Sequence, residues 1–124
     1  KIIANDNEGL QMISACCAGA EIKISEIKYL QKNKVFLLSL RRNKIETENE
    51  SNIVNSICKF EFVDSVKSKN INQDEIDQKL ELITMDYLKN KDNYEISLIF
   101  TNNAYITLST EIIEVTLDDQ NKID

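Results

Sequence analysis

Residues 94–109, YEISLIFTNNAYITLS, decide the fold class of this chain. Apolar side chains recur at every second position from Tyr94 to Phe100, which is the period of a strand with one buried face. Asn102 and Asn103 follow, and asparagine tolerates the positive φ angles of a tight turn. The segment YITLS then returns with strand-forming residues. The stretch therefore predicts an antiparallel β-hairpin.

Segments on both sides of this hairpin also have strand character. Residues 56–69, SICKFEFVDSVKSK, alternate cleanly and predict one strand with Cys58, Phe60 and Phe62 on the same side. Residues 80–88, LELITMDYL, fit a strand or a helix, and we favour the strand. The final apolar segment IIEVTLDD (112–119) predicts another strand.

The region from residue 20 to residue 40 predicts a second hairpin. Ile22 and Ile24 begin a two-residue period, which slips near Ser25 and Glu26 and so suggests a β-bulge. The return arm VFLLSL begins with an unbroken apolar run, which predicts burial on both faces of that strand.

A helix is expected near the N-terminus, over about residues 6–18. Asn5 or Asp6 can cap its first amides, and Gly19 suits its C-terminal end. Three apolar side chains fall on one face at helical spacing: Leu10, Ile13 and Cys17.

The architecture predicted from these segments is a single α+β domain over residues 1–124. The N-terminal helix packs on a mainly antiparallel sheet of about six strands, which either curls into a barrel or stays flat. Residues 42–55 are dense in Asn and Glu without an apolar period, and we expect a polar surface loop there.

Composition and charge exclude several classes of protein. The formal net charge is -6, and the only arginines are Arg41 and Arg42, so nucleic acid would be repelled. No apolar run has the length of a membrane span, and we expect a cytoplasmic protein that binds no membrane. The three cysteines, with Cys16 and Cys17 adjacent, also suit a reducing compartment.

The residue types present restrict the possible chemistry. The chain has no histidine, which removes the usual general base and the commonest transition-metal ligand. Three cysteines cannot form a four-thiolate zinc site, and we expect Cys17 and Cys58 to pack in the core. With two glycines there is no phosphate-binding loop or dinucleotide fingerprint. We therefore predict no catalytic residue, no metal and no cofactor.

Four charged residues are the candidates for a ligand site. Glu26 and Asp86 lie within apolar segments, and Arg41 and Arg42 directly follow the strand VFLLSL. If they converge in a cleft, they could bind a small anion or perform weak acid–base chemistry. The alternative is that the arginines form salt bridges with Glu26 or with other surface acids.

These sequence patterns do not identify the function of the protein. We favour a non-enzymatic binding or protein-interaction module that uses a sheet edge or the helix-covered face. The alternatives are a small-anion-binding protein or enzyme built on Glu26, Arg41, Arg42 and Asp86, or a structural subunit of a homo-oligomer.

Four blocks of the sequence carry a resemblance: LQMISACCAGAEIKISEIKYLQKNKVFLLSLRRN, LELITMDYL, YEISLIF and AYITLSTEIIEVTLDD. Their order and spacing resemble the uncharacterised bacterial family known as domain of unknown function 2948, over residues 10–42 and 80–119. This resemblance implies small cytoplasmic proteins with no agreed activity, cofactor or catalytic residue. The matching small and polar positions are Ser14, Ala15, Ala20, Lys23, Glu26 and Arg42. The chain departs from the family near residues 41–45, where the family tends to carry aromatic residues.

Overall fold

The predicted hairpin is present in the computed structural model, which describes residues 1–47 and 50–120. Strand β8 (Tyr94–Phe100) pairs antiparallel with β9 (Tyr105–Thr110). Asn102 and Asn103 have φ angles of 63° and 58°, so they occupy the left-handed conformation that the turn requires. The alternation also holds, since Ile96, Leu98 and Phe100 are buried.

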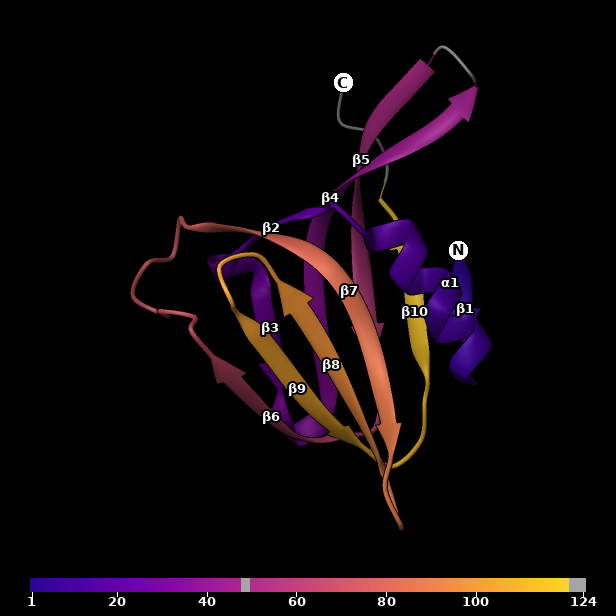
Figure 1. Cartoon of the computed structure of the whole chain (residues 1–124), viewed down its shortest axis with the longest axis vertical. Helices are drawn as coiled ribbons and strands as arrows, with labels where there is room; N and C mark the ends of the chain where they lie inside the picture. The colour runs from indigo at the N-terminus through magenta and orange to yellow at the C-terminus, as the bar shows by residue number, and fades with distance from the viewer. Residues whose placement is uncertain (48–49, 121–124) are drawn as a thin grey trace.

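The hairpin belongs to a ten-stranded antiparallel sheet in the order β1-β10-β5-β4-β2-β7-β8-β9-β6, with β3 paired to β4 beside this path. The remaining strands are β1 (Ile2–Ala4), β2 (Glu21–Lys23), β3 (Ile27–Leu30), β4 (Val35–Thr47), β5 (Glu50–Phe60), β6 (Val63–Lys69), β7 (Lys79–Lys89) and β10 (Val115–Asp119). The sheet curls so that β7, β8 and β9 lie across from β4, β5 and β10 (Figure 1).

This arrangement confirms the α+β class and corrects its details. The sheet has ten strands instead of about six, and its curl does not close into a barrel in the described part of the chain. A turn divides the expected first arm of the hairpin over residues 20–40 into β2 and β3, of three and four residues. Strand β1 was not expected, because a period of two cannot be recognised in a segment of three residues.

The polar surface loop expected over residues 42–55 is wrong. Strand β4 continues to Thr47 and β5 begins at Glu50, and the paired strands project from the sheet as a ribbon (Figure 1). Asn43 and its partner Ile53, near the base of the ribbon, are both exposed. The residues of these two strands within 42–55 are mostly polar, so the sequence carries no apolar alternation to reveal them.

Helix α1 (Asn7–Cys17) confirms the helix prediction. The Asp6 side chain accepts a hydrogen bond from the Gly9 amide at 2.8 Å, as an N-cap does. Gly9 suits this position because a Cβ there would lie 2.8 Å from the Cβ of Ala4 in β1. The helix contacts β1, β7 and β4, so it fills the side of the curled sheet between β1 and β7.

A hydrogen bond ties α1 to an irregular point of β7. The pairing of β7 with β8 shifts register between Leu82 and Thr84. Just beyond the shift, the Met85 amide donates to Ser14 Oγ on α1 at 2.9 Å. Ser14 therefore satisfies a buried backbone donor and sets the position of the helix on the strand.

Three local predictions need correction. The expected bulge at Ser25 and Glu26 is a 3₁₀ turn, η1 (Ile24–Glu26), which separates β2 from β3. Strand β4 is buried mainly on one face, because Val35 is only half-buried at its start. The segment 56–69 is two strands: β5 ends at Phe60, and Phe62 is 39% exposed in the following turn with a φ of 58°.

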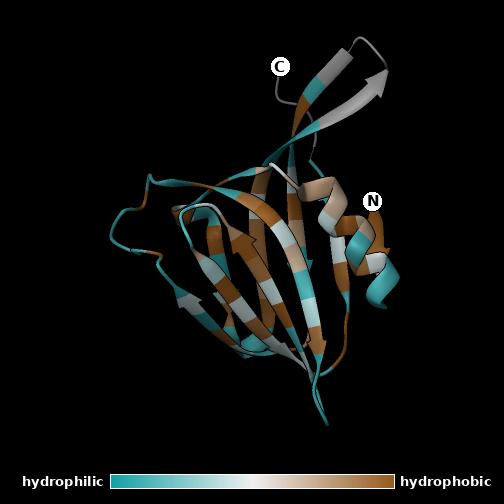
Figure 2. Cartoon of the chain, in the orientation of Figure 1, coloured by the Kyte–Doolittle hydropathy of each residue, from teal (hydrophilic) through white to brown (hydrophobic). Residues whose placement is uncertain are grey.

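The core occupies the space between the two halves of the sheet and α1. Hydrophobic residues alternate with hydrophilic ones along the strands in both halves of the sheet, and α1 also carries hydrophobic residues (Figure 2). The largest fully buried side chains come from α1, β2, β4, β5, β7 and β8: Phe36, Phe60, Phe100, Leu10, Ile13, Ile22, Leu38, Leu40, Leu80, Leu82, Met85 and Ile96.

Candidate functional site

The sheet fails to close between β3 and β6, and this opening is the candidate site. Within the described residues, β3 pairs with β4, and β6, the last strand of the sheet, pairs with β9. At one end the two strands are held together, because the Val63 amide donates to the Lys34 carbonyl at 2.8 Å. The Tyr29 hydroxyl adds a bond to the Val63 carbonyl at 2.9 Å.

The other end of the opening is bordered by residues 70–78, which connect β6 to β7. Two backbone hydrogen bonds of 3.1 Å hold this connection to η1: from the Ser25 amide to the Ile76 carbonyl, and from the Ile24 amide to the Gln78 carbonyl. The connection therefore has a defined position at the rim. Two of its isoleucines, Ile71 and Ile76, take part in the lining.

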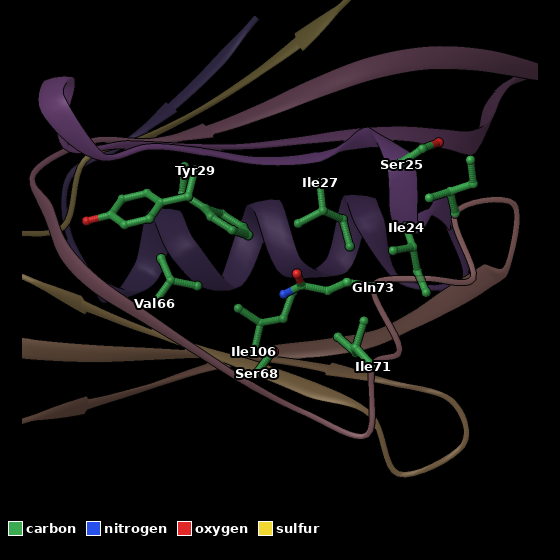
Figure 3. Close-up of a pocket in the computed structure, with 11 residues that line it drawn as sticks. Ile24, Ser25, Ile27, Tyr29, Val66, Ser68, Ile71, Gln73 and Ile106 are labelled. Carbon is green, nitrogen blue, oxygen red and sulfur yellow. The ribbon is translucent and has the colours of Figure 1, made fainter.

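A cavity of about 330 Å³ lies within this opening. Most of its wall is aliphatic or aromatic (Figure 3). The side chains come from η1, β3, β4, β6, β9 and the 70–78 connection: Ile24, Ser25, Ile27, Tyr29, Phe36, Val66, Ser68, Ile71, Gln73, Ile76 and Ile106. The inner end of the cavity meets the core, to which Phe36 and Ile106 belong.

Three neutral polar side chains accompany the apolar wall: Ser25, Ser68 and Gln73. Gln73 extends from the connection and lies between Ile27 and Ile106 (Figure 3). No lining residue is Asp, Glu, Lys or Arg among the residues that the structure describes. The site therefore offers apolar contact and neutral hydrogen bonding, without a fixed charge.

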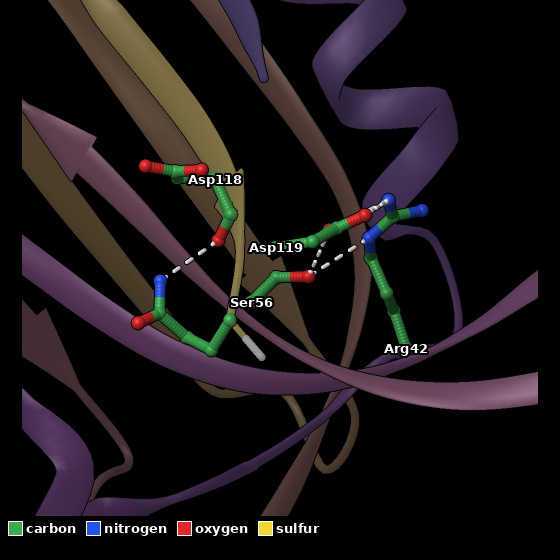
Figure 4. Close-up of polar contacts among 5 residues, drawn as sticks. Arg42, Ser56, Asp118 and Asp119 are labelled. Atoms are coloured by element: carbon green, nitrogen blue, oxygen red, sulfur yellow. Dashed lines mark hydrogen bonds and ion pairs between the residues drawn. The ribbon is translucent and has the colours of Figure 1, made fainter. Parts of the chain in front are cut away.

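Arg42, a predicted site residue, lies at a different place in the molecule. It is 8% exposed on the core face of β4, where its Nε donates to Ser56 Oγ at 3.0 Å. Its Nη2 donates to both carboxylate oxygens of Asp119, at 2.9 and 3.1 Å (Figure 4). Ser56 Oγ also donates to Asp119 at 2.6 Å. The cluster joins β4, β5 and β10 and provides a polar end to the core.

Glu26 and Arg41 lie together on the outer surface. Both line a hollow of about 290 Å³, because Arg41 points to the opposite face of β4 from Arg42. Glu21 lies between two cations there, with its carboxylate 3.8 Å from Arg41 Nη1 and 3.5 Å from Lys79 Nζ. Asp86 is exposed on β7 and does not line this hollow. The structure thus brings together two of the four predicted residues.

The core positions predicted for Cys17 and Cys58 are confirmed, since both are fully buried. A hydrogen bond from the Cys58 thiol, helped by the nearby Arg42 charge, lowers the pKa of Cys17 although burial opposes this. The same bond, together with burial, raises the pKa of Cys58 well above its usual value. Cys16 is half-buried and packs against the core from α1.

Sequence reasoning missed the cavity because its lining comes from six separate segments. The polar connection NINQDEIDQK held one usable signal: two isolated isoleucines, Ile71 and Ile76, in an otherwise hydrophilic stretch. Both isoleucines line the cavity, which explains their presence in a hydrophilic segment.

Two kinds of feature are absent from the described residues, 1–47 and 50–120. These residues contain no cluster of Cys, Asp and Glu that could hold a metal ion. They also contain no helix with the length and apolar character needed to cross a bilayer.

Comparison with known proteins places the chain in a family. No curated protein and no solved structure was found to match it. One family model, described as "Protein of unknown function (DUF2948)", matches residues 1–123. The predicted resemblance is confirmed over nearly the whole length: the chain belongs to the DUF2948 family.

Proposed function

We propose that this chain is a non-enzymatic binding protein that holds a small molecule in the cavity between β3 and β6. The observation that carries this proposal is the cavity itself, about 330 Å³ with a mainly apolar wall and a few neutral polar groups. Ligand pockets in proteins have volumes of about 300–1,000 Å³, are lined in this way, and occur in the mouths of β-barrels.

The composition of the cavity wall favours binding over catalysis. General acid–base catalysis needs a titratable side chain at the reacting atoms. The titratable group in the lining is Tyr29, whose hydroxyl already donates to the Val63 carbonyl. Serine activation needs an adjacent base, and Ser25 and Ser68 share the cavity with no acidic or basic side chain of the described chain.

A protein-interaction role through a sheet edge has weaker support. Within the described residues β1, β3 and β6 each pair on one side only, and β1 and β3, with three and four residues, offer few backbone groups for pairing. Strand β6 is longer but carries Lys67 and Lys69, and lysine on an edge strand discourages pairing with another chain. The cavity is therefore the better-supported binding surface.

A blocking variant tests the proposal. Ser68 lies at the exposed rim of the cavity, so Ser68→Trp would fill the opening with little disturbance of the core. Ser65→Trp is the matched control, because Ser65 is exposed on the same strand and does not line the cavity. Binding is measured with a neutral naphthalene dye whose fluorescence rises in apolar surroundings.

The expected result is that the parent chain and Ser65→Trp bind the dye, while Ser68→Trp binds it at least about tenfold more weakly, a loss of about 1.4 kcal/mol. Equal binding by both variants would show that the dye sits elsewhere. No binding of the dye to the parent chain would also contradict the proposal. Circular dichroism of both variants verifies that each keeps the β-sheet spectrum.

A further inference from the structure

From the chemistry of the cavity wall we infer the class of ligand: a small uncharged molecule with an apolar body and one alcohol or amide group. This inference rests on the proposed function and makes it more specific. It differs from the sequence-based expectation of an anion site at Glu26, Arg41, Arg42 and Asp86, which lie outside this cavity.

The alternation of side chains along β3 and β6 keeps the lysine side chains of these strands out of the cavity lining. In β3, Ile27 and Tyr29 face the cavity while Lys28 between them is exposed on the other side. In β6, Val66 and Ser68 face the cavity while Lys67 between them points outward. Lysines are thus frequent around the opening, but the strand period directs each of them away from it.

A charged ligand would be poorly accommodated for this reason. Moving an ionised carboxylate from water to an apolar site without a partner carries a large desolvation penalty. Among the described lining residues there is no cation to offset that penalty. The net charge of -6 also repels anions at long range.

The neutral polar groups of the lining indicate one hydrogen-bonding group on the ligand. Ser25, Ser68 and Gln73 are exposed residues of the lining, so a ligand in the cavity could reach their polar groups. Hydroxyl and amide groups both donate and accept, so together they match a ligand group that does both. An alcohol or a primary amide has this property, whereas a carboxylate only accepts.

The volume sets the scale of the probes. At about 330 Å³ the cavity lies near the lower end of the range of about 300–1,000 Å³ for ligand pockets. We therefore choose probes with a ten-carbon chain and one polar end.

Three probes of nearly equal length separate charge from size: 1-decanol, decanamide and decanoate. Each is titrated against the complex of the parent chain with the neutral dye at neutral pH, where decanoate is ionised. We expect 1-decanol and decanamide to displace the dye at concentrations at least about tenfold lower than decanoate, which corresponds to about 1.4 kcal/mol.

A charge introduced at the rim should reduce this difference. Ser68→Lys places an ammonium group at the cavity, and we expect it to improve displacement by decanoate at least about fivefold without improving displacement by 1-decanol. Ser65→Lys adds the same charge on the outer face of β6 and should leave the difference unchanged. This control separates a local contact from the effect of net charge.

The possible failures can be told apart. If the dye binds but decanoate displaces it as well as 1-decanol does, or neither neutral probe displaces it, the ligand class is wrong while the proposed function stands. If the dye does not bind, or binds equally after Ser68→Trp, the proposed function itself fails.

Discussion

Replacing Arg42 by methionine should destabilise the protein far more than the same replacement of its neighbour Arg41. The methionine keeps much of the apolar stem but removes the donors to Ser56 and Asp119. Removing one partner of a buried ion pair costs about 3–5 kcal/mol. The side chain of Asp119 is 27% exposed, so water offsets part of this loss. We expect a loss of about 2–3 kcal/mol.

Urea unfolding followed by circular dichroism measures this loss. Domains of this size unfold with slopes of about 1–3 kcal/mol per molar urea, so the midpoint should fall by about 0.7–3 M. Arg41→Met is the matched control. The Arg41 side chain is 54% exposed and lies 3.8 Å from Glu21, so its loss should cost about 0–1 kcal/mol.

A double-mutant cycle identifies the cause of the effect. Asp119→Asn removes the negative charge but keeps an acceptor for Ser56. Combined with Arg42→Met it should cost about 1–2 kcal/mol less than the sum of the two single losses, because neither partner is left with an uncompensated charge. Equal losses for Arg41→Met and Arg42→Met, or strict additivity in the cycle, would refute the structural role of this pair.

Three further outcomes are expected. A hydrogen bond with Glu61 raises the pKa of Glu114 above its ordinary value of 4.5. The contribution of Glu114 to stability is therefore present below pH 4.5 and disappears as pH rises through the raised pKa. Glu114→Gln should remove this pH dependence from urea unfolding midpoints measured across mildly acidic pH. Ser14→Ala leaves the Met85 amide without its acceptor and should cost about 1–3 kcal/mol in the same assay, and a cost below about 0.5 kcal/mol would mean that water replaces the hydroxyl. Gly9→Ala puts a Cβ 2.8 Å from a side-chain carbon of β1 and should lower the thermal midpoint, although alanine is normally the better helix former; a higher midpoint would show that β1 moves aside at little cost.

Binding in the cavity can also be tested through the thermal stability of the protein. A ligand of the proposed class would raise the thermal midpoint of the parent chain with increasing concentration, because it binds the folded state. Thermal scans with 1-decanol and decanoate at equal concentrations would therefore check the same preference without a dye. A larger shift with decanoate would contradict the inferred ligand class.

Local features of the chain were predictable because local physics determines them. The hairpin at 94–110 was predictable, since alternating burial and two asparagines suited to positive φ lie within one stretch. Helix α1 was predictable for the same reason, because the Asp6 cap and the apolar face at Leu10, Ile13 and Cys17 are spaced at helical intervals. The absence of histidine limits the possible chemistry through composition alone.

Features that depend on contacts between distant segments were decided only by the tertiary structure. Residues 42–47 and 50–55 are mostly polar and show no apolar period, so their strands are recognised only by their pairing. A salt bridge of Arg42 with an acid was one of the two alternatives in the sequence, but its partner Asp119 lies 77 residues away and was identified only by the fold. Glu26 and Arg41 share a hollow with Lys79 at the start of β7, but Asp86 lies seven residues farther along that strand and does not line it.

The cavity is the clearest case of this division. Alternation along β3 and β6 indicated which side chains face inward, but it did not say that these two strands border an opening. That depends on how far the sheet curls, which is the accumulated result of strand twist and pairing along the whole sheet. The sequence by itself determined the apolar and neutral character of the residues in the wall. Only the fold brought six segments together around a space of about 330 Å³.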